Sequence, residues 1–273
     1  MLSFPLMSAA GRANELDGRE WTRCSLSVWA DIRLTAEERR LGHPAMFPTT
    51  LVERLIQCFM READRFILDP FLGSGSTLAA ARNQGKVGAG FEVCEKFIRA
   101  ARQRAGGDFQ IIRADARHLG EYVAAGSVDF CVTSPPYWNI LQQKRTADHK
   151  RTRHYGAAEN DLGKIAEYGQ FLDELGKVFA AVYTALRPGK YCVVNVMDLR
   201  KASRFYPLHA DLAVRMQALG YVFDDLIIWD RRMEYNNLRP LGYPHVFRIN
   251  KVHEYLLIFQ KPLPAAHRRA RQP

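Results

Sequence analysis

The sequence has no apolar run long enough to cross a membrane. A transmembrane helix needs about 18 or more consecutive apolar residues, and no such run occurs along the chain. The N-terminal segment also lacks the basic stretch and the sustained apolar stretch of a secretory signal peptide. The sequence therefore predicts a soluble, cytoplasmic protein without a membrane partner.

Cysteine is sparse, and its spacing suggests no paired site. The five cysteines are an odd number, lie far apart and include no CxxC pair. Disulfide frameworks need an even set of cysteines, and zinc sites need closely spaced ones. Neither a disulfide framework nor a bound metal is expected, and this cysteine usage fits a reducing compartment.

The balance of charge is uneven. Lysine and arginine number 39 against 29 aspartates and glutamates, which gives a formal net charge of +10 and a pI near 9.5. Fixed positive charge attracts phosphate-bearing ligands. The hydrophobic fraction of 47% and the charged fraction of 25% are ordinary for a globular domain. The basic surplus therefore points to a polyanionic partner of a folded protein.

Short strand-like segments alternate with longer helix-like segments. The former are rich in β-branched or aromatic residues and are bounded by Gly, Pro, Asp or Asn. They cover residues 65–69, 86–92, 109–113, 128–133, 191–197, 223–229 and 254–259. Helical spacing of apolar residues appears between them, at residues 49–60, 76–85, 94–105, 165–189 and 208–220. This alternation predicts an α/β fold with a doubly wound, mostly parallel sheet.

Residues 67–81 place a strand, a glycine-rich turn and a helix in direct succession. Gly73 and Gly75 let the backbone turn tightly and approach a ligand closely, and either Ser76 or Thr77 is placed to cap the helix. The third glycine of a dinucleotide-binding turn is absent. Asp69, at the carboxyl end of the strand, instead favours a cationic ligand group such as the amino group of a methionine moiety. A plain structural turn is the alternative.

Two further carboxylates stand at the ends of predicted strands. Glu92 closes the second strand, about twenty residues after the glycine turn, where such folds bind a ribose hydroxyl. Asp115 follows the third strand and is placed to accept a hydrogen bond from an adenine amino group. Each residue alone would be an ordinary helix cap. Their shared position at strand ends makes both of them candidate ligand contacts.

Residues 128–139 combine an apolar strand with a rigid polar loop. The loop, called the SPPY loop below, consists of Ser134, Pro135, Pro136 and Tyr137. Two consecutive prolines fix φ, so the Ser134 hydroxyl and the Pro135 carbonyl are held in one direction. Two such acceptors suit the hydrogens of an exocyclic amine on a flipped base, with Tyr137 stacked on the ring, and orient its nitrogen toward a methyl donor. A rigid loop with a buried tyrosine is the alternative.

Four segments together resemble the DNA amino methyltransferases, which make N4-methylcytosine or N6-methyladenine. Residues 43–48, HPAMFP, are similar to an HPxxFP element of that family, and residues 69–77, DPFLGSGST, to its cofactor loop. Residues 133–138, TSPPYW, resemble its catalytic loop, and residues 253–261, HEYLLIFQK, its late strand. The similarity covers roughly residues 28–261, nearly the whole chain.

The resemblance implies a Rossmann-like class I methyltransferase fold with seven strands, the last one antiparallel, and S-adenosyl-L-methionine as cofactor. It implies that His43, Pro44 and Phe47 belong to the element beside the methionine end of the cofactor. It also implies that Phe71 lies in the cofactor loop. The cofactor elements precede the SPPY loop, as in a permuted class of the family.

The residue before the two prolines bears on the target base. Ser134, preceded by threonine, resembles the cytosine-N4 enzymes, whereas adenine-directed members more often carry Asp or Asn. A C5-cytosine enzyme is disfavoured, because it needs a nucleophilic cysteine and the chain has no Pro-Cys dipeptide. The prediction is a cytosine-N4-specific methyltransferase of double-stranded DNA, either with a cognate restriction endonuclease as functional partner or as an orphan enzyme. An adenine-N6 or RNA-directed enzyme and a non-catalytic nucleic-acid-binding protein are the alternatives.

Two basic segments are candidate DNA contacts. Residues 142–156 follow the SPPY loop and suit phosphates beside a flipped base; a solvated charged loop is the alternative. Residues 229–251 mix arginine with asparagine, which read guanine and adenine edges in a bidentate manner. The candidates are Lys144, Arg145, Lys150, Arg151 and Arg153 in the first segment, and Arg231, Arg232, Asn236, Asn237 and Arg239 in the second.

The expected organisation is one methyltransferase domain at residues 28–261. DNA-contacting insertions are expected at about 138–164 and 230–252 of that domain. Residues 1–27 show no clear periodicity and are expected to form a flexible arm. Residues 262–273 are expected to form a disordered basic tail.

Overall fold

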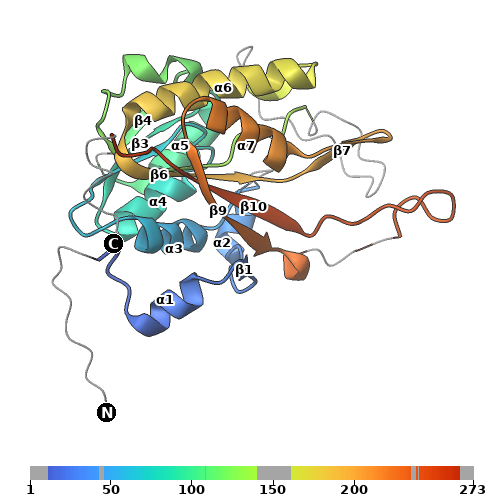
Figure 1. The fold of residues 1–273 in the computed structure, drawn as a ribbon, viewed down its shortest axis with the longest axis horizontal. Helices are drawn as coiled ribbons and strands as arrows, with labels where there is room; N and C mark the ends of the chain where they lie inside the picture. The colour runs from blue at the N-terminus through green and yellow to red at the C-terminus, as the bar shows by residue number, and fades with distance from the viewer. Residues whose placement is uncertain are drawn as a thin grey trace.

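One eight-stranded sheet runs through the part of the chain that the structure describes. The computed structural model describes residues 12–42, 46–107, 109–139, 161–234, 238 and 240–264. The strand order is β1-β9-β10-β6-β5-β2-β3-β4, with the elements arranged as in Figure 1. The strands are β1 (Val28–Trp29), β2 (Phe66–Asp69), β3 (Val87–Phe91), β4 (Gln110–Ile112), β5 (Val128–Thr133), β6 (Leu186–Val196), β9 (Val222–Asp230) and β10 (His253–Gln260).

All seven predicted strands lie in this sheet, so the α/β prediction with a mostly parallel sheet is confirmed. The last strand, β10, pairs antiparallel with both β6 and β9. The sequence does not predict the eighth strand, β1, which has only two residues and pairs parallel with β9. Trp29 secures β1, because its side chain is buried against the sheet and its indole N–H donates to the carbonyl of Cys24.

The order of the strands reverses between β2 and β5. The chain adds β3 and β4 on one side of β2, and then β5 and β6 on the other side. Doubly wound sheets bind ligands outside the carboxyl ends of their strands at such a reversal. The crevice is therefore expected between the turn that follows Asp69 and the loop that follows Thr133.

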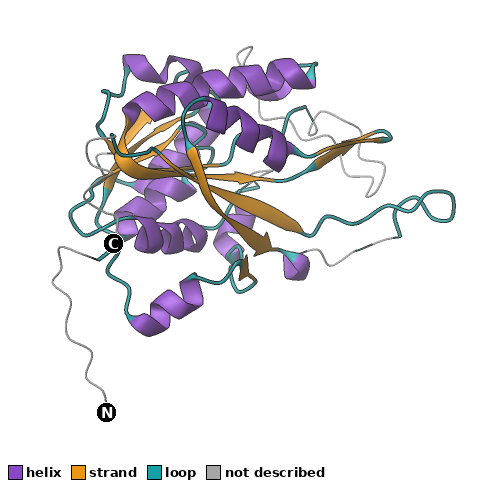
Figure 2. Ribbon diagram, in the orientation of Figure 1, coloured by secondary structure: helices purple, strands orange, loops and turns teal. Residues whose placement is uncertain are grey.

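Helices cover both faces of the sheet (Figure 2). α3, α4 and α5 contact one another on one face, and α6 and α7 contact one another on the other. Successive residues of β5 point to opposite faces of the sheet. Phe130 therefore packs in the hydrophobic core on the α3 side, and Cys131 packs in the core on the α6 side. No helix within the described ranges is both long and apolar enough to span a bilayer. The helices are α1 (Gly18–Cys24), α2 (Ala36–Arg40), α3 (Thr49–Phe59), α4 (Ser76–Asn83), α5 (Glu95–Ala105), α6 (Tyr168–Ala185) and α7 (Leu208–Ala218).

The helix predicted at residues 165–189 ends earlier than expected. β6 begins at Leu186, so Pro188 and Gly189 lie within a strand and not at a helix end. Leu186 pairs with Val128 of β5, and the N–H of Gly189 donates to the segment that follows β10. Because β6 is hydrogen-bonded to neighbours on both sides, the strand continues across Pro188 and Gly189, although such a pair ordinarily ends an element.

The N-terminal region differs from the flexible arm expected for residues 1–27. Asp17 and Glu20 form a reciprocal capping box that starts α1. The side chain of Asn14 donates to the backbone carbonyl of Cys58 at 2.9 Å, which ties this region to α3. A seven-residue helix is too short to show clear periodicity, and only its capping pair could have indicated it. The first eleven residues lie outside the described ranges.

A small hairpin that the sequence analysis did not predict follows β6. β7 (Leu199–Lys201) pairs antiparallel with β8 (Arg204–Tyr206). Ala202, with φ of +52°, turns the chain between them. In Figure 1 the hairpin projects from the body of the molecule in the same direction as the connection between β9 and β10. The hairpin forms a separate two-stranded sheet that follows the carboxyl end of β6.

Candidate active site

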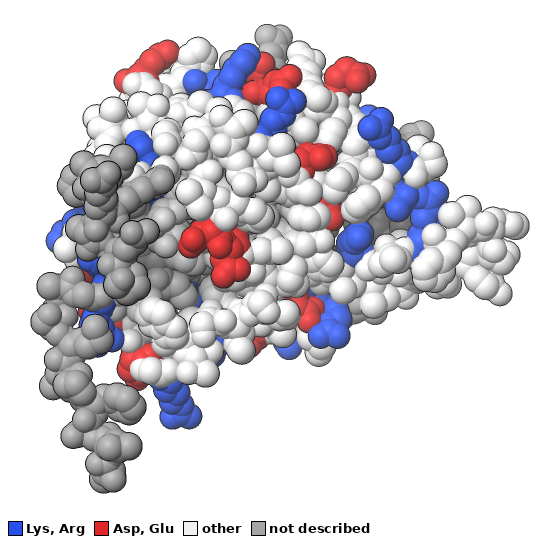
Figure 3. Space-filling model, viewed as in Figure 1, with Lys and Arg blue, Asp and Glu red and all other residues white. Residues whose placement is uncertain are grey.

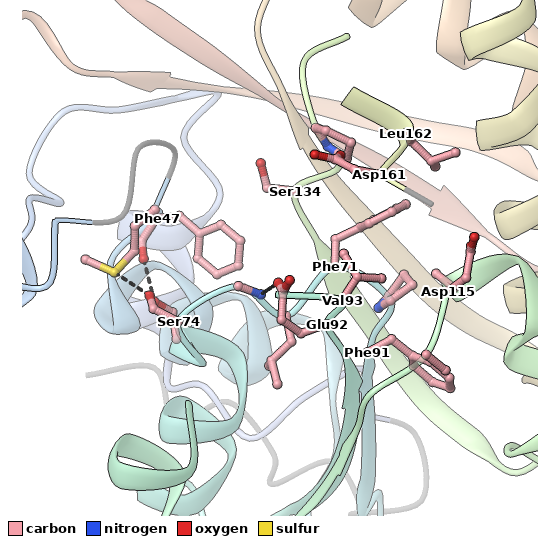
Figure 4. Close-up of a pocket in the computed structure, with 18 residues that line it drawn as sticks. Phe47, Phe71, Ser74, Phe91, Glu92, Val93, Asp115, Ser134, Asp161 and Leu162 are labelled. Carbon is pink, nitrogen blue, oxygen red and sulfur yellow. Dashed lines mark hydrogen bonds between the residues drawn. The ribbon is translucent and has the colours of Figure 1, made fainter. Parts of the chain in front are cut away.

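A pocket lies at the reversal of strand order, between the turn after β2 and the loop after β5. It holds about 780 Å³ of empty space, a figure that includes open solvent. Figure 4 shows Ser134 and Asp161 across this space from Glu92. The lining residues are Met46, Phe47, Pro70, Phe71, Leu72, Gly73, Ser74, Ser76, Phe91, Glu92, Val93, Ala114, Asp115, Ala116, Ser134, Pro136, Asp161 and Leu162.

The turn after β2 has a shape that requires glycine. Gly73 and Gly75 have φ of +54° and +87°, in the left-handed region. Gly75 does not line the pocket; a Cβ there would lie 2.8 Å from the Cα of Ala101 in α5. Gly73 does line the pocket, and its N–H donates to Glu92 at 3.0 Å. Gly73 thus faces the pocket, and Gly75 allows α4 and α5 to approach each other.

Glu92 is held in place by backbone N–H groups. Its carboxylate accepts hydrogen bonds from Gly73 at 3.0 Å and from Cys94 at 2.7 Å. Burial raises the pKa of Glu92 to about 7, while backbone hydrogen bonds act in the opposite direction and the Asp161 carboxylate raises it further. A carboxylate oxygen can accept more than one hydrogen bond. Glu92 therefore has capacity left for a ligand hydroxyl.

Asp69 does not line the pocket. It is fully buried and accepts hydrogen bonds from the hydroxyls of Thr77 at 2.5 Å and Thr133 at 2.6 Å. The N–H of Phe71 donates to it at 2.9 Å. Burial raises the pKa of Asp69 to about 6, against the effect of these hydrogen bonds. In this geometry Asp69 and Thr77 hold the frame of the pocket and do not face its contents.

Asp115 lines the pocket from the end of β4. Burial raises its pKa, but hydrogen bonds from the side chain and backbone N–H of Arg117 outweigh burial and leave the pKa below its ordinary value. Arg117 also bonds Glu174 of α6 at 2.5 Å. Phe47 and Phe71, the two aromatic residues predicted as cofactor contacts, line the same pocket. The pocket therefore brings together residues that were predicted as cofactor contacts from separate segments of the sequence.

The SPPY loop borders the pocket on the side of β5. Ser134 and Pro136 line the pocket, whereas Pro135 and Tyr137 are buried and absent from its lining. Tyr137 is only 8% exposed, so its ring does not offer the stacking surface that the sequence analysis expected. A buried phenol needs a hydrogen-bond partner for its hydroxyl, and this partner lies inside the protein.

That partner is a carboxylate from a distant strand. The hydroxyl of Tyr137 donates to Glu254 of β10 at 2.9 Å. The side-chain amide of Asn195, in β6, donates to Tyr137 at 3.2 Å and to Glu254 at 2.5 Å. The hydroxyl oxygens of Ser134 and Tyr137 lie 3.1 Å apart. The pocket-lining serine is thus linked through a buried tyrosine to a buried glutamate.

Sequence reasoning missed several residues of the pocket. Met46 lies within the HPxxFP element, and its sulfur accepts a hydrogen bond from Ser74 at 2.9 Å. Asp161 caps a short helical turn by accepting from the N–H of Gly163 at 2.8 Å, and burial raises its pKa. The capping pattern is visible in the sequence, but nothing local shows that Asp161 returns to face Glu92.

A half-buried arginine supports the wall that carries Met46 and Phe47. Arg104, in α5, donates to the hydroxyl of Ser76 at 3.0 Å and to that of Thr49 at 2.8 Å. It also pairs with the buried carboxylate of Glu38 at 3.1 Å. These bonds connect α2, α3, α4 and α5 behind the pocket.

The predicted DNA contacts divide into three groups. Arg231 is 17% exposed and pairs with Glu254 and Glu234, so it belongs to the network behind the SPPY loop. Arg232 is 68% exposed and pairs with Asp230 at 2.6 Å. The other predicted DNA contacts lie outside the described residues: Lys144, Arg145, Lys150, Arg151, Arg153, Asn236, Asn237 and Arg239. The predicted cofactor contacts His43 and Pro44 also lie outside them.

Comparison with known families identifies the chain. A family model described as DNA methylase, of the N6/N4 type, matches residues 11–103 and 128–270. The chain belongs to the N6/N4 DNA methylase family. The matched segments contain the glycine turn, the SPPY loop and Glu254, so they include the strand that supports the loop as well as the loop itself.

Individual relatives match smaller parts of the molecule. The Type II methyltransferase M.ScaI of Streptomyces caespitosus is 40% identical over 76 residues, 26% of this chain and 25% of that protein. The chain thus spans about a quarter of the length of the curated relatives it matches. A DNA modification methylase of Thermus thermophilus, TTHA0409, solved with S-adenosyl-L-methionine, is 32% identical, with 59% of this chain and 61% of that chain covered and a TM-score of 0.40. The cyclase SpnF is 13% identical over 79% of this chain and 82% of its own, with a TM-score of 0.52, a likeness of fold alone.

Proposed function

We propose that this DNA methylase transfers the methyl group of S-adenosyl-L-methionine to N4 of a cytosine flipped out of double-stranded DNA. The observation that carries the proposal is that Ser134 of the SPPY loop lines the same pocket as Glu92 and Asp115. One pocket therefore joins carboxylates at strand ends to an acceptor suited to an amine. Membership of the N6/N4 family supports this class of reaction.

The lining of the pocket fits the cofactor. Its charged residues are the carboxylates Glu92, Asp115 and Asp161, and neither Lys nor Arg occurs among the described residues that line it. When bound, S-adenosyl-L-methionine supplies a methyl group on a positively charged sulfur, which such an acidic pocket favours. Glu92 is the proposed acceptor for ribose hydroxyls, and Phe71 supplies an apolar wall.

The network behind the SPPY loop sets the direction of the Ser134 hydroxyl. A carboxylate accepts hydrogen bonds, so the hydroxyl of Tyr137 is the donor in its hydrogen bond with Glu254. The oxygen of Tyr137 then accepts from Asn195 and from Ser134. Because the proton of Ser134 points toward Tyr137, the Ser134 lone pairs are left to accept from a ligand in the pocket.

These residues prepare the target amine for transfer. Ser134 accepts one amine hydrogen, and the backbone carbonyl of Pro135 is the proposed second acceptor. Holding both hydrogens orients the nitrogen lone pair and stabilises the positive charge that develops on the nitrogen. Since Tyr137 points inward, Pro136, which lines the pocket, is the proposed contact for the face of the base. No covalent link between protein and base is needed.

The DNA would approach along the same edge of the sheet. Arg232 is the exposed member of the predicted recognition segment within the described residues. We propose that it acts with the basic residues of segment 142–156 and of positions 236–239, as insertions in one methyltransferase domain. The names of the Type II relatives support a role in a restriction-modification system.

Methyl transfer from labelled S-adenosyl-L-methionine to mixed-sequence duplex DNA tests the proposal. The wild-type protein is expected to label the DNA, and Ser134→Ala is expected to lose nearly all of this activity. Ser127→Ala, in the loop before β5 and outside the pocket lining, is the matched control and is expected to stay active. Binding of the cofactor without any label in DNA would contradict the proposal and favour an RNA-directed enzyme or a binding protein.

A further inference from the structure

We propose that the β7–β8 hairpin is a second DNA-binding element, whose arginines bind phosphates next to the flipped base. This inference rests on the proposed function and extends it to a surface outside the two basic segments found in the sequence. Three features carry it: the hairpin contacts the catalytic loop, it bears positive charge on both faces, and its carboxylate neighbour is buried.

The inner face of the hairpin packs on the residues that follow the SPPY loop. The amine of Lys201 lies 4.1 Å from the centre of the Trp138 ring and 3.4 Å from the side-chain oxygen of Asn139. The ring of Tyr206 lies 5.0 Å from that of Trp138. The indole N–H of Trp138 is itself fixed to the carbonyl of Ile165 at 2.8 Å. The hairpin is therefore held in place by Trp138, the residue that follows the SPPY loop.

The rest of the hairpin is exposed and basic. Arg200 and Arg204 are exposed, and residues 199–206 contain neither Asp nor Glu. The pairing register sets Arg200 opposite Phe205 and Arg204 opposite Lys201. Adjacent pairs in a hairpin point to opposite faces, so the two exposed arginines project from different faces of the ribbon and give it a positive potential that attracts a polyanion.

A neighbouring projection adds to this charge. The β9–β10 arm, defined here as residues 240–252, contains no acidic residue. The amine of Lys251 lies 4.9 Å from the centre of the Phe205 ring, and the guanidinium carbon of Arg200 lies 5.6 Å from the same ring. Figure 3 shows Lys and Arg side chains gathered where the hairpin meets the arm. Phe205 thus brings two cations together by cation–π contact.

The acid closest along the chain does not offset this charge at the surface. Asp198 precedes β7, is 4% exposed, and is bonded to His209 at 2.6 Å and to the hydroxyl of Tyr255 at 3.3 Å. A two-stranded ribbon has a width that the DNA major groove accepts, and arginine suits phosphate oxygens. Duplex DNA is the proposed occupant, because the hairpin packs on Trp138 and Asn139, directly after the SPPY loop that must receive a base from the same molecule.

Salt-dependent binding of a fluorescein-labelled duplex of mixed sequence tests the inference, with S-adenosylhomocysteine present so that no transfer occurs. The variant Arg200→Gln/Arg204→Gln is expected to reduce the slope of log K against log salt by about 1.8, at about 0.9 per lost phosphate contact. Each single variant is expected to lose half of this. Arg99→Gln/Arg102→Gln removes the same charge from exposed positions of α5 and is expected to keep the wild-type slope.

The outcomes separate the inference from the proposed function. A hairpin variant with the wild-type slope, while the wild type binds and methylates DNA, overturns the inference alone. An equal loss in the α5 control assigns the effect to net charge and also overturns it. A loss seen with duplex RNA but not with duplex DNA overturns the choice of partner. A wild type that binds no duplex DNA overturns both the inference and the proposed function.

Discussion

The two sides of the pocket are built by contacts of very different range. On the side of β3, the carboxylate of Glu92 is fixed by the N–H of Cys94, two residues away. On the side of β5, Tyr137 is fixed by Glu254, 117 residues later, and by Asn195, 58 residues later. The position of the Glu92 carboxylate is therefore set largely by the turns that follow β2 and β3. The catalytic side exists only once β5, β6 and β10 have assembled.

The largest expected effect separates the two sides directly. Ser134→Ala removes the pocket-lining hydroxyl and is expected to lower kcat for transfer to duplex DNA by about 100–1000-fold, the range for one preorganised hydrogen bond to a transition state. Calorimetric titration is expected to show unchanged affinity for S-adenosyl-L-methionine, because Glu92 and its backbone partners are untouched. A parallel loss of cofactor affinity would contradict the division into two sides.

Glu254→Gln tests whether the distant glutamate acts through the tyrosine. The new amide can donate to Tyr137, which would turn the tyrosine proton toward Ser134. A fall in kcat of about 10–100-fold is expected, as for other residues that orient a functional side chain.

A double-variant cycle gives a readout that a purely structural role would not move. Tyr137→Phe added to Glu254→Gln is expected to cost little more than either change alone, since both act on the same proton of Ser134. Additive losses, or a large fall in melting temperature for Glu254→Gln, would argue against a positioning role.

Asp69 joins the two sides, so its loss is expected to appear in stability. Asp69→Ala leaves the hydroxyls of Thr77 and Thr133 without their buried acceptor. The free energy of unfolding, measured with urea, is expected to fall by about 2 kcal/mol. Asp31→Ala is the control: it removes an exposed ion pair with Arg54 and is expected to cost no more than about 1 kcal/mol. Equal losses would show that Asp69 does not connect the two sides.

The smallest expected effect is the pH dependence of cofactor binding. Glu92 has a pKa of about 7 in the folded protein. Only the ionised carboxylate can accept hydrogen bonds with both oxygens, because the protonated form carries an O–H donor on one of them. Protons therefore compete with the cofactor, and affinity is expected to fall about tenfold from pH 8 to pH 6. Glu92→Gln is expected to bind more weakly at pH 8 and to lose this slope. The same slope in both proteins would assign the titration to another group.

The same contrast explains how much could be predicted from the sequence. Gly73, Glu92 and Asp115 line one pocket, and the sequence could bring them forward as candidates because strand ends and turn glycines are local signals. Asp69 was assigned to the ligand, yet its partners Thr77 and Thr133 occupy its oxygens. A carboxylate at a strand end is visible in a sequence, but the groups that satisfy it depend on neighbouring strands.

The missed features depend on distant packing or belong to elements too short to show a pattern. Tyr137 was expected to stack on a base, but Glu254 and Asn195 draw its hydroxyl inward. Arg231 was expected to contact DNA, but it pairs with the same glutamate. The β7–β8 hairpin has strands of three residues, too short for an alternating pattern to stand out. Its basic composition was present in the sequence, but its place beside the SPPY loop was not.

Nucleoside analysis of the methylated DNA tests the central claim most directly. Duplex DNA of mixed sequence is incubated with the wild-type protein and labelled S-adenosyl-L-methionine, digested to nucleosides and separated. The account expects the label in N4-methylcytosine, with Ser134→Ala giving almost none. Label in N6-methyladenine would contradict the choice of cytosine, and the absence of label from any nucleoside would contradict the proposed activity itself.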